Sequence, residues 1–564
     1  MSSRFQYLLL SLIAGTLLWL AWPSSPGTLF IFVALTPLLW LAENVRNIKA
    51  YWAWTLLAFT LFNAATTWWV GNTTVPASGV FANLFTALLM TIPFTSYYGA
   101  RKRLGRTGAY VALIVYWMTF EYVNLTWEFA WPWLSLGNAF AMRPDWVQWY
   151  QYTGVGGGTL WVLLVNITAY ECWRKFPELD IKYVGRMLRL LWKPALVLFV
   201  VPFVLNVLAL LNTHPANDSK PMKIKVVIVQ PNIDPYDKFT EGADAQQLDL
   251  LLKLSAQKAD SSTQYIIWPE TALFTEGAWE NELRMNPEIL RIRDFLQQHA
   301  PNAVLISGAS TLKRYGHELQ EFPYTARPLS DGGAYDAFNA AIQIDPAGGV
   351  QVYHKAKLVP GAEIVPYVKY LSFMGNFALD MGGITGGYGL TPGVLLMSRD
   401  IKPGPGLGSP NGPQVAPVVC YESVFGEYMA RQVKQGAQFS VIMTNDGWWG
   451  NTEGHRQHLN YARLRAIETH RWIARCANTG ISAFISPSGE VIDAQPYWQQ
   501  AVMEHSVTIE TVQTLYVRFG DYLYKAAAIF CILLIIYRIY LRFAKRANYV
   551  EGDQPASSKR SIPG

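Results

Sequence analysis

The sequence predicts a multi-pass α-helical membrane domain joined to one α/β domain. Apolar residues make up 51% of the 564 residues and charged residues only 15%, against about 25% charged residues in ordinary soluble domains. Apolar runs close to the ~20 residues that cross a bilayer fill the N-terminal part and recur once near the C-terminus. Between them lies a polar segment in which strand and helix patterns alternate. This composition excludes a disordered, collagen-like or disulfide-stapled chain.

Eight apolar runs are expected to cross the membrane. They lie near residues 6–22, 29–43, 51–70, 81–100, 108–127, 155–172, 192–211 and 522–541. No A-x-A cleavage site follows the first run, which favours an uncleaved span over a signal peptide. The chain then divides into a seven-span block (1–211), a water-soluble domain (212–520), an eighth span (521–543) and a polar tail (544–564).

Lys and Arg residues predict the orientation of these spans. They gather in the loops of one side, whereas the opposite short loops hold Arg143 alone. The positive-inside rule then predicts that both termini are cytoplasmic. Eight spans would place the large domain outside, in the periplasm of a bacterium with an inner membrane. These charges need no nucleic-acid partner to explain them.

The large domain is expected to form a mixed sheet with covering helices. Dense apolar runs predict strands at 223–230, 265–268, 303–308, 339–344, 350–353, 415–419 and 440–443. Helical spacing predicts helices at 244–258, 287–299 and 454–474, the last with Arg at several exposed positions.

Three chemically capable residues each follow one of these strands. Glu270, in the run WPETA, can be a desolvated general base or simply a carboxylate at a helix N-terminus. Lys355 can stabilise an oxyanion or be a solvated lysine. Cys420 can be a nucleophile presented at a turn or a small buried hydrophobic residue. The order Glu, Lys, Cys at three strand ends favours the catalytic interpretation of all three.

Several motifs together make a resemblance specific. They are AWPWLSLGN (130–138), VQPNID (229–234), WPETA (268–272), YHKAKLVPGAEIVP (353–366), VVCYESVF (418–425), NDGWWG (445–450) and ARLRAIETHRWIARCANTGISAFI (462–485). On these runs the large domain resembles the nitrilase superfamily. The whole chain resembles the apolipoprotein N-acyltransferase family, in which a nitrilase-like domain lies between the last two of eight spans. The resemblance implies a four-layer α-β-β-α sandwich.

The resemblance also implies roles for matching residues. Cys420 would be the nucleophile, Glu270 the base that takes its proton, and Lys355 the group that stabilises the oxyanion. Glu363 would be a second carboxylate beside this triad, and Tyr421 and Glu422 match the pair after the family's Cys. Two positions depart from the family pattern. Gly361-Ala362 replaces the usual Phe-Gly, and Phe239 stands where the family has a functional Trp.

The family activity implied is acyl transfer in two steps through a Cys thioester. The donor would be a phospholipid such as phosphatidylethanolamine, and the acceptor the α-amine of an S-diacylglyceryl-cysteine apolipoprotein. No cofactor is expected, and a monomer is favoured because a membrane anchor would block the surfaces through which soluble nitrilases assemble. A membrane-tethered amidase stays open as an alternative, since water and an amine attack the same thioester. A transporter is disfavoured, because the spans carry few charges at mid-membrane.

A few further residues have two interpretations each. Trp448 and Trp449 either face an acyl chain or pack in the fold, and aromatic loops near 127–133 and 146–152 either anchor at the interface or line a lipid path. His455 and His458 stand three residues apart, but zinc would need further ligands, so no metal site is expected.

Overall fold

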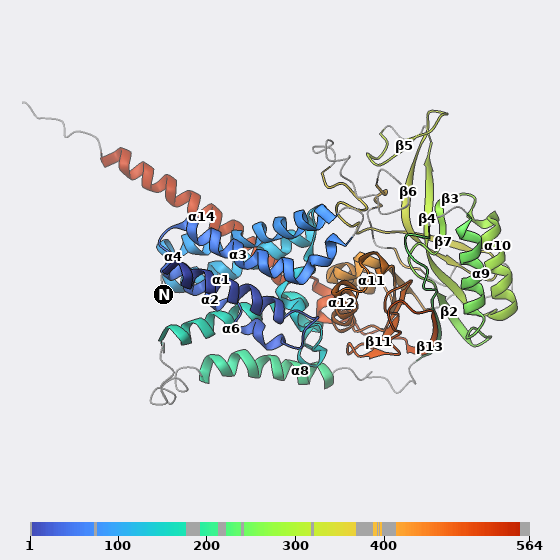
Figure 1. The fold of residues 1–564 in the computed structure, drawn as a ribbon, viewed down its shortest axis with the longest axis horizontal. Helices are drawn as coiled ribbons and strands as arrows, with labels where there is room; N and C mark the ends of the chain where they lie inside the picture. Colours follow the sequence, from blue (N-terminus) through green and yellow to red (C-terminus); the bar gives the residue numbers. More distant parts are fainter. Residues whose placement is uncertain are drawn as a thin grey trace, which may run out of the picture.

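The computed structural model describes residues 3–72, 76–175, 192–211, 222–238, 242–316, 321–367, 387–391, 393, 395–397 and 413–552. Two parts lie side by side along the longest axis of the molecule (Figure 1). One is a block of helices from the N-terminal part of the chain. The other is an α/β domain, and the last helix returns from it to pack against the helical block.

Helices occupy every range that the sequence predicts as a span. The block comprises α1 (Ser3–Leu20), η1 (Thr28–Phe32), α2 (Thr36–Asn44), α3 (Ile48–Thr67), η2 (Trp68–Gly71), α4 (Pro76–Thr126), η3 (Pro132–Leu134), η4 (Leu136–Phe140), η5 (Pro144–Trp146), α5 (Tyr150–Thr153), α6 (Val155–Lys175), η6 (Leu196–Val200), α8 (Val201–Leu211) and α14 (Tyr522–Gly552). Two expected spans share the helix α4, which kinks at Gly105, where φ is 67°.

Four helices in the described part of the chain are long and apolar enough to cross a bilayer on length and composition. They are Ser3–Leu20, Pro76–Thr126, Trp192–Leu211 and Tyr522–Tyr540, and Thr28–Asn44 is a shorter apolar helical segment. Large apolar side chains on the last two helices are exposed, among them Phe203 at 67% and Phe530 at 60%. Such faces are stable only in an apolar surrounding, so the helical block is a membrane domain. How many of its helices cross the bilayer stays a prediction.

The α/β domain contains two sheets. The larger follows the order β13-β1-β2-β4-β6-β5, with β3 on β4 and β7 on β6, and the smaller follows β12-β11-β10-β9-β8. Their strands are β1 (Lys223–Gln230), β2 (Thr263–Ile267), β3 (Leu273–Trp279), β4 (Val304–Tyr315), β5 (Arg327–Pro328), β6 (Ala334–Ile344), β7 (Val350–His354), β8 (Val415–Val419), β9 (Phe439–Thr444), β10 (Ile473–Ala477), β11 (Ala483–Ile485), β12 (Val491–Ile492) and β13 (Ala501–Thr508).

These sheets and their helices make the four layers that the family resemblance implies. Alternate residues of the two sheets, such as Ile228 and Met443, share one buried cluster between the sheets. Helices α9 (Ala243–Ser255) and α10 (Pro287–His299) cover the outer face of the larger sheet. Helices α11 (Gly426–Lys434) and α12 (Glu453–Thr469) cover the smaller sheet on the side of the helical block (Figure 1). The α-β-β-α fold class is confirmed.

The helix predicted at 454–474 is too long. It ends at Thr469, because His470 takes a left-handed conformation with φ 49° that reverses the chain. Residues Ile473–Ala477 then form β10, which pairs in parallel with β9. The expected exposure of its Arg side chains holds only in part, since Arg456 is exposed, whereas Arg465 and Arg471 are buried with 2% exposure each. Helical spacing could not reveal this end, which depends on strand pairing across the sheet.

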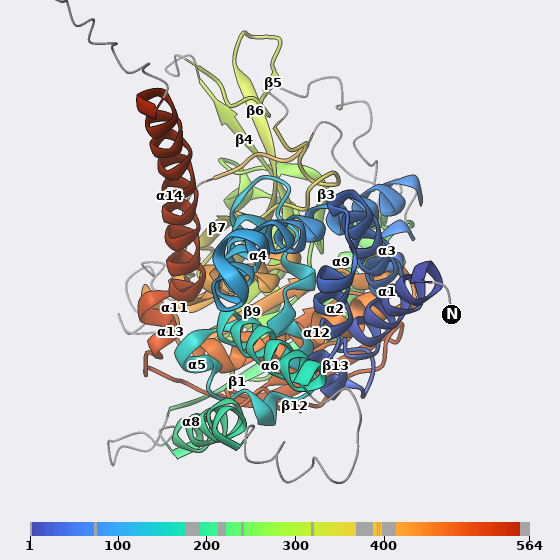
Figure 2. The ribbon, with the colours of Figure 1, turned by 90° about the vertical axis from the view of Figure 1, so that its left-hand side faces the viewer.

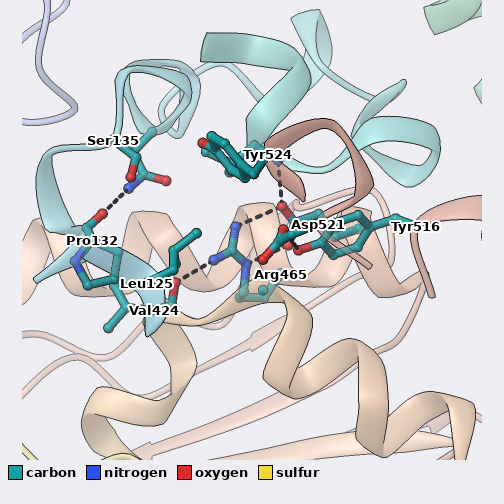
Figure 3. Close-up of a pocket in the computed structure, with 12 residues that line it drawn as sticks. Leu125, Pro132, Ser135, Val424, Arg465, Tyr516, Asp521 and Tyr524 are labelled. Atoms are coloured by element: carbon teal, nitrogen blue, oxygen red, sulfur yellow. Dashed lines mark hydrogen bonds and ion pairs between the residues drawn. The ribbon is translucent and has the colours of Figure 1, made fainter. Parts of the chain in front are cut away.

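Helix α12 joins the two parts of the molecule through buried hydrogen bonds. Trp133 Nε1 donates to Gln457 Oε1 at 2.7 Å, and Tyr461 Oη donates to the Trp133 carbonyl at 2.8 Å. Seen from the helical side, the block lies directly in front of the α/β domain (Figure 2). Further along α12, Arg465 pairs with Glu468 at 2.7 Å and lines a small cavity between the two parts (Figure 3).

Candidate active site

The structure brings together the three residues that the sequence places at separate strand ends. Glu270 lies just after β2, Lys355 follows β7, and Cys420 follows β8, which belongs to the other sheet. Lys355 Nζ donates to Glu270 Oε1 at 3.1 Å, with side chains 1% and 8% exposed. The charges of Glu270 and Lys355 both act on the Cys420 thiol. Glu270 and Lys355 therefore form a buried ion pair that lies close enough to the buried Cys420 for both charges to act on its thiol.

Glu363 completes this cluster. Its Oε1 accepts a second hydrogen bond from Lys355 Nζ, at 2.7 Å, and its Oε2 accepts the Val359 N–H at 2.8 Å. The loop that carries it departs from the family pattern at Gly361-Ala362, and Gly361 has φ 83°, a conformation that favours glycine. The Gly361 N–H donates to the Ile364 carbonyl at 2.8 Å. This tight turn brings the Glu363 carboxylate to the lysine.

Asn339 is a site residue that sequence reasoning missed. Its Nδ2 donates to Glu270 Oε1 and to Glu363 Oε1, at 2.9 Å each, which are the same two oxygens that Lys355 contacts. It lies inside β6, at the start of the run 339–344, whose apolar pattern predicts only a buried strand. The signal that could have revealed it is a carboxamide in a run that is otherwise buried and apolar, since such a group needs polar partners.

Lys238 is a second missed residue, in the loop after β1. Its Nζ donates to the backbone carbonyl of Glu270 and to Thr271 Oγ1, both at 2.8 Å. Thr271 has φ 46°, an unusual conformation for a β-branched residue. Burial lowers the pKa of Lys238 to about 7. Lys238 therefore holds the backbone at Glu270 in place. The Asn445 N–H donates to Glu270 Oε2, at 3.1 Å, and so holds the carboxylate itself.

Cys420 is the first residue after β8 and begins the 3₁₀ turn Cys420–Val424. Its φ of 50° lies in the left-handed region, a conformation that non-glycine residues rarely adopt and that collects at functional sites. Burial raises the pKa of the Cys420 thiol well above its ordinary value, the Glu270 carboxylate raises it further, and the Lys355 ammonium opposes both. The resting sulfur is therefore a thiol, which needs a base before it can attack.

Lys355 keeps its charge despite complete burial. Burial alone would lower its pKa, but the neighbouring Glu270 and Glu363 carboxylates outweigh burial and raise the pKa well above its ordinary value. The ammonium therefore supplies a permanent positive charge within the cluster. Such a fixed cation can stabilise negative charge that develops on a substrate oxygen.

Tyr421 and Glu422 brace the turn rather than join the cluster. Glu422 Oε2 accepts the Val419 N–H at 2.7 Å, and Oε1 accepts the Tyr353 hydroxyl and the Ala356 N–H at 2.6 Å each. It thus ties the end of β8 to the end of β7. Tyr421 Oη donates to the Ala130 carbonyl of the helical block at 2.8 Å. This contact puts the turn that begins at Cys420 at the junction with the membrane domain.

The other aromatic candidates take packing positions. Trp448 is half-buried and packs edge-on against Tyr236, with ring centroids 5.4 Å apart. Trp449 packs against Trp69 and Trp133 of the helical block, at 4.7 and 6.1 Å. The aromatic loop at 127–133 therefore contacts the α/β domain through Trp133, a third role beside the two expected. Phe239 lies outside the described residues.

Within the described ranges, no group of three or more His, Cys, Asp or Glu side chains could hold a metal ion. This holds for the surroundings of His455 and His458 as well. His455 stacks on Tyr497, with ring centroids 4.1 Å apart. His458 hydrogen-bonds to Asp446 at 2.9 Å and to Ser423 at 2.8 Å.

Comparisons with known proteins agree along the chain. The Carbon-nitrogen hydrolase family matches residues 225–516, and the Apolipoprotein N-acyltransferase N-terminal domain matches residues 14–168. An Apolipoprotein N-acyltransferase from Chlorobaculum tepidum is 32% identical over 523 residues, which cover 91% of this chain and 92% of that protein. Another, from Geobacter metallireducens, is 24% identical and covers 91% of both chains.

Solved structures also resemble part of this chain. One is a CN-hydrolase superfamily protein from Xanthomonas campestris with an arsenic adduct in its active site. It is 15% identical, with a TM-score of 0.34 over 56% of this chain and 97% of that one. An amidase from Nesterenkonia sp. is 16% identical, with a TM-score of 0.33 over 52% of this chain and 93% of that one.

Replacing Lys355 by Met should make the Cys420 thiol harder to ionise. The lysine lowers the thiol pKa, so its loss raises that pKa, and alkylation by iodoacetamide, which needs the thiolate, should shift to higher pH. Peptide mass spectrometry of the full-length protein in detergent measures the rate at Cys420 alone. Lys357→Met is the matched control, because its ammonium lies over the Phe425 ring, 5.0 Å from the centroid. An unchanged pH curve for Lys355→Met would contradict the expectation.

Proposed function

The chain belongs to the apolipoprotein N-acyltransferase family, and on that premise we propose that it moves a fatty acyl chain from a phospholipid to a lipoprotein through a thioester on Cys420. The acceptor is the N-terminal α-amine of an S-diacylglyceryl-cysteine apolipoprotein. The observation that carries this proposal is the buried cluster of Glu270, Lys355 and Glu363, in which Glu270 and Lys355 act on the Cys420 thiol, next to the membrane domain.

The first half-reaction forms the acyl-enzyme. Glu270 takes the Cys420 proton, and the thiolate attacks the ester carbonyl of the phospholipid. The tetrahedral oxyanion forms beside the Lys355 ammonium, which stabilises it. The C–O bond then breaks, and the leaving alkoxide recovers the proton from Glu270 as lysophospholipid departs. The acyl carbon stays on sulfur.

The second half-reaction transfers the acyl chain to nitrogen. The α-amine attacks the thioester carbonyl, and a new C–N bond forms as the C–S bond breaks. Glu270 accepts the proton that the amine loses and returns it to the sulfur, so the enzyme ends as it began. Because the donor leaves before the acceptor binds, the kinetics are ping-pong. Glu363 and Asn339 hold the Lys355 and Glu270 side chains in place through both steps.

The contacts of the nucleophile's turn support a lipid substrate over a small soluble amide. Tyr421 bonds to Ala130 and its ring stacks on Trp131, 6.1 Å between centroids. Both partners belong to the membrane domain, so the active site is built partly against that domain. Phosphatidylethanolamine is the donor that we propose, and we propose a monomer as the working unit.

Mass spectrometry of the full-length protein after incubation with vesicles of phosphatidylethanolamine and phosphatidylglycerol should show a fatty acyl adduct on Cys420. Adding a diacylated lipopeptide with a free α-amine should discharge this adduct into an N-acylated peptide. Cys420→Ser should form no thioester and no product. Free fatty acid appearing instead of N-acylated peptide would support the hydrolase alternative, and product formation by Cys420→Ser would overturn the proposal.

Gly308→Ala should slow formation of the acyl-enzyme. A Cβ at this position in β4 would lie 2.5 Å from Glu270 Cα and 2.5 Å from Thr271 N, so the backbone that carries the base must move. A displacement of this kind can reduce the rate on the order of a hundredfold. The matched control is Gly99→Ala in the helical block, where nothing lies within 4 Å of the new Cβ. Equal acylation rates for the two variants in the same vesicles would contradict the expectation.

We propose the bacterial inner membrane as the location, with both termini in the cytoplasm and the α/β domain in the periplasm. The distribution of Lys and Arg between the loops supports this orientation. A fluorescent protein fused after residue 564 should fluoresce in cells, because such fusions mature in the cytoplasm. Alkaline phosphatase inserted near residue 330, in the α/β domain, should be active. The opposite pattern would reverse the orientation.

A further inference from the structure

The backbone carbonyl of Cys420 is held by two side chains outside the candidate triad. Ser423 Oγ donates to this carbonyl at 2.7 Å. His458 Nε2, from α12, lies 2.8 Å from Ser423 Oγ and 3.2 Å from the same carbonyl oxygen. Cys420 has a left-handed backbone, with φ 50°, so the turn requires contacts of this kind to persist.

The other edge of the His458 imidazole contacts Asp446, which forms a buried ion pair with Arg475. His458 Nδ1 lies 2.9 Å from Asp446 Oδ1, and Arg475 Nη2 contacts Asp446 Oδ2 at 2.5 Å. All three side chains are completely buried. Burial favours the neutral acid, but Arg475 and His458 outweigh it and hold the pKa of Asp446 well below its usual range. Asp446 is therefore a carboxylate, which only accepts hydrogen bonds.

The contacts of the imidazole place it between two buried groups. Because Asp446 only accepts hydrogen bonds, the ring nitrogen that faces it, Nδ1, carries a proton. Nε2, on the opposite edge, lies within hydrogen-bond distance of the Ser423 hydroxyl and of the Cys420 carbonyl. His458 thus links Asp446 to the turn that begins at Cys420.

We propose that His458 is a positioning residue for the acyl transfer, holding the Cys420 turn so that the thiol faces Glu270 and Lys355. This inference rests on the proposed role of Cys420 as the nucleophile. The same face of α12 contacts the membrane domain, because the His458 ring lies 5.8 Å from the Trp133 ring and the adjacent Gln457 accepts the Trp133 N–H. His458 therefore connects the nucleophile's backbone to the helix that joins the two parts of the protein.

Two amide substitutions of His458 test the contacts of its two ring nitrogens separately. In His458→Gln the amide group can occupy the place of Nε2 and keep a hydrogen bond to the Cys420 carbonyl or to Ser423 Oγ. In His458→Asn the shorter amide can reach only Asp446. The rate of acyl-enzyme formation is measured by mass spectrometry with the full-length protein in phosphatidylethanolamine vesicles, beside the KM for the lipopeptide acceptor and the unfolding temperature.

We expect His458→Asn to slow acylation by roughly ten- to a hundredfold, the effect of losing one buried hydrogen bond. His458→Gln should stay within about fivefold of the original protein, a recovery typical of a retained hydrogen-bond donor. The KM for the acceptor should not change in either variant. If a His458 variant does not fold, Ser423→Ala tests the same contacts, because it removes the hydroxyl that donates to the Cys420 carbonyl and should slow acylation in the same direction.

Equal acylation rates for the Gln and Asn variants would overturn the inference, whether both are fast or both are slow. So would an acylation rate for Ser423→Ala that matches the original protein. Cys420→Ser is run in parallel. If that variant retains acyl transfer, the proposed function itself fails; if it is inactive while His458→Asn works normally, only the positioning role fails.

Discussion

The candidate active site depends on one buried cation. An ammonium taken out of water costs several kcal/mol unless opposite charges replace its hydration. Lys355, 1% exposed, receives two carboxylates at 3.1 and 2.7 Å. These two acids would repel each other without the lysine, and Asn339 donates to both. The cluster therefore forms as a unit, and it holds the loops after β2 and β7 beside the end of β8.

This arrangement leaves Glu270 suited to move a proton. Its side chain is fixed by Lys355, Asn339 and the Asn445 N–H, and its backbone by Lys238. A base that is already oriented spends no free energy on reorganisation during the reaction. The neighbouring thiol is protonated at rest, because burial and the Glu270 carboxylate raise its pKa well above its ordinary value.

The membrane domain contributes to the site as well as anchoring it. Its aromatic loop reaches the turn that begins at Cys420 through Ala130 and Trp131, and Trp133 hydrogen-bonds to Gln457 of α12. Long-range polar contacts of this kind, buried among aromatic rings, are costly to break. The two parts are therefore expected to keep a defined relative position while lipid tails approach from the bilayer.

The sequence alone determined the division into helical and α/β parts, most strands, and three residues at strand ends that the fold brings together. Local signals suffice there, because apolar periodicity and turn residues act within a few positions of the chain. Only the tertiary structure decided that Asn339 faces Glu270 and Glu363, that Lys238 holds the backbone of Glu270, and that α12 stops at Thr469. Those features depend on partners from other strands and helices, and a buried polar group acquires its role from whichever groups the fold places against it.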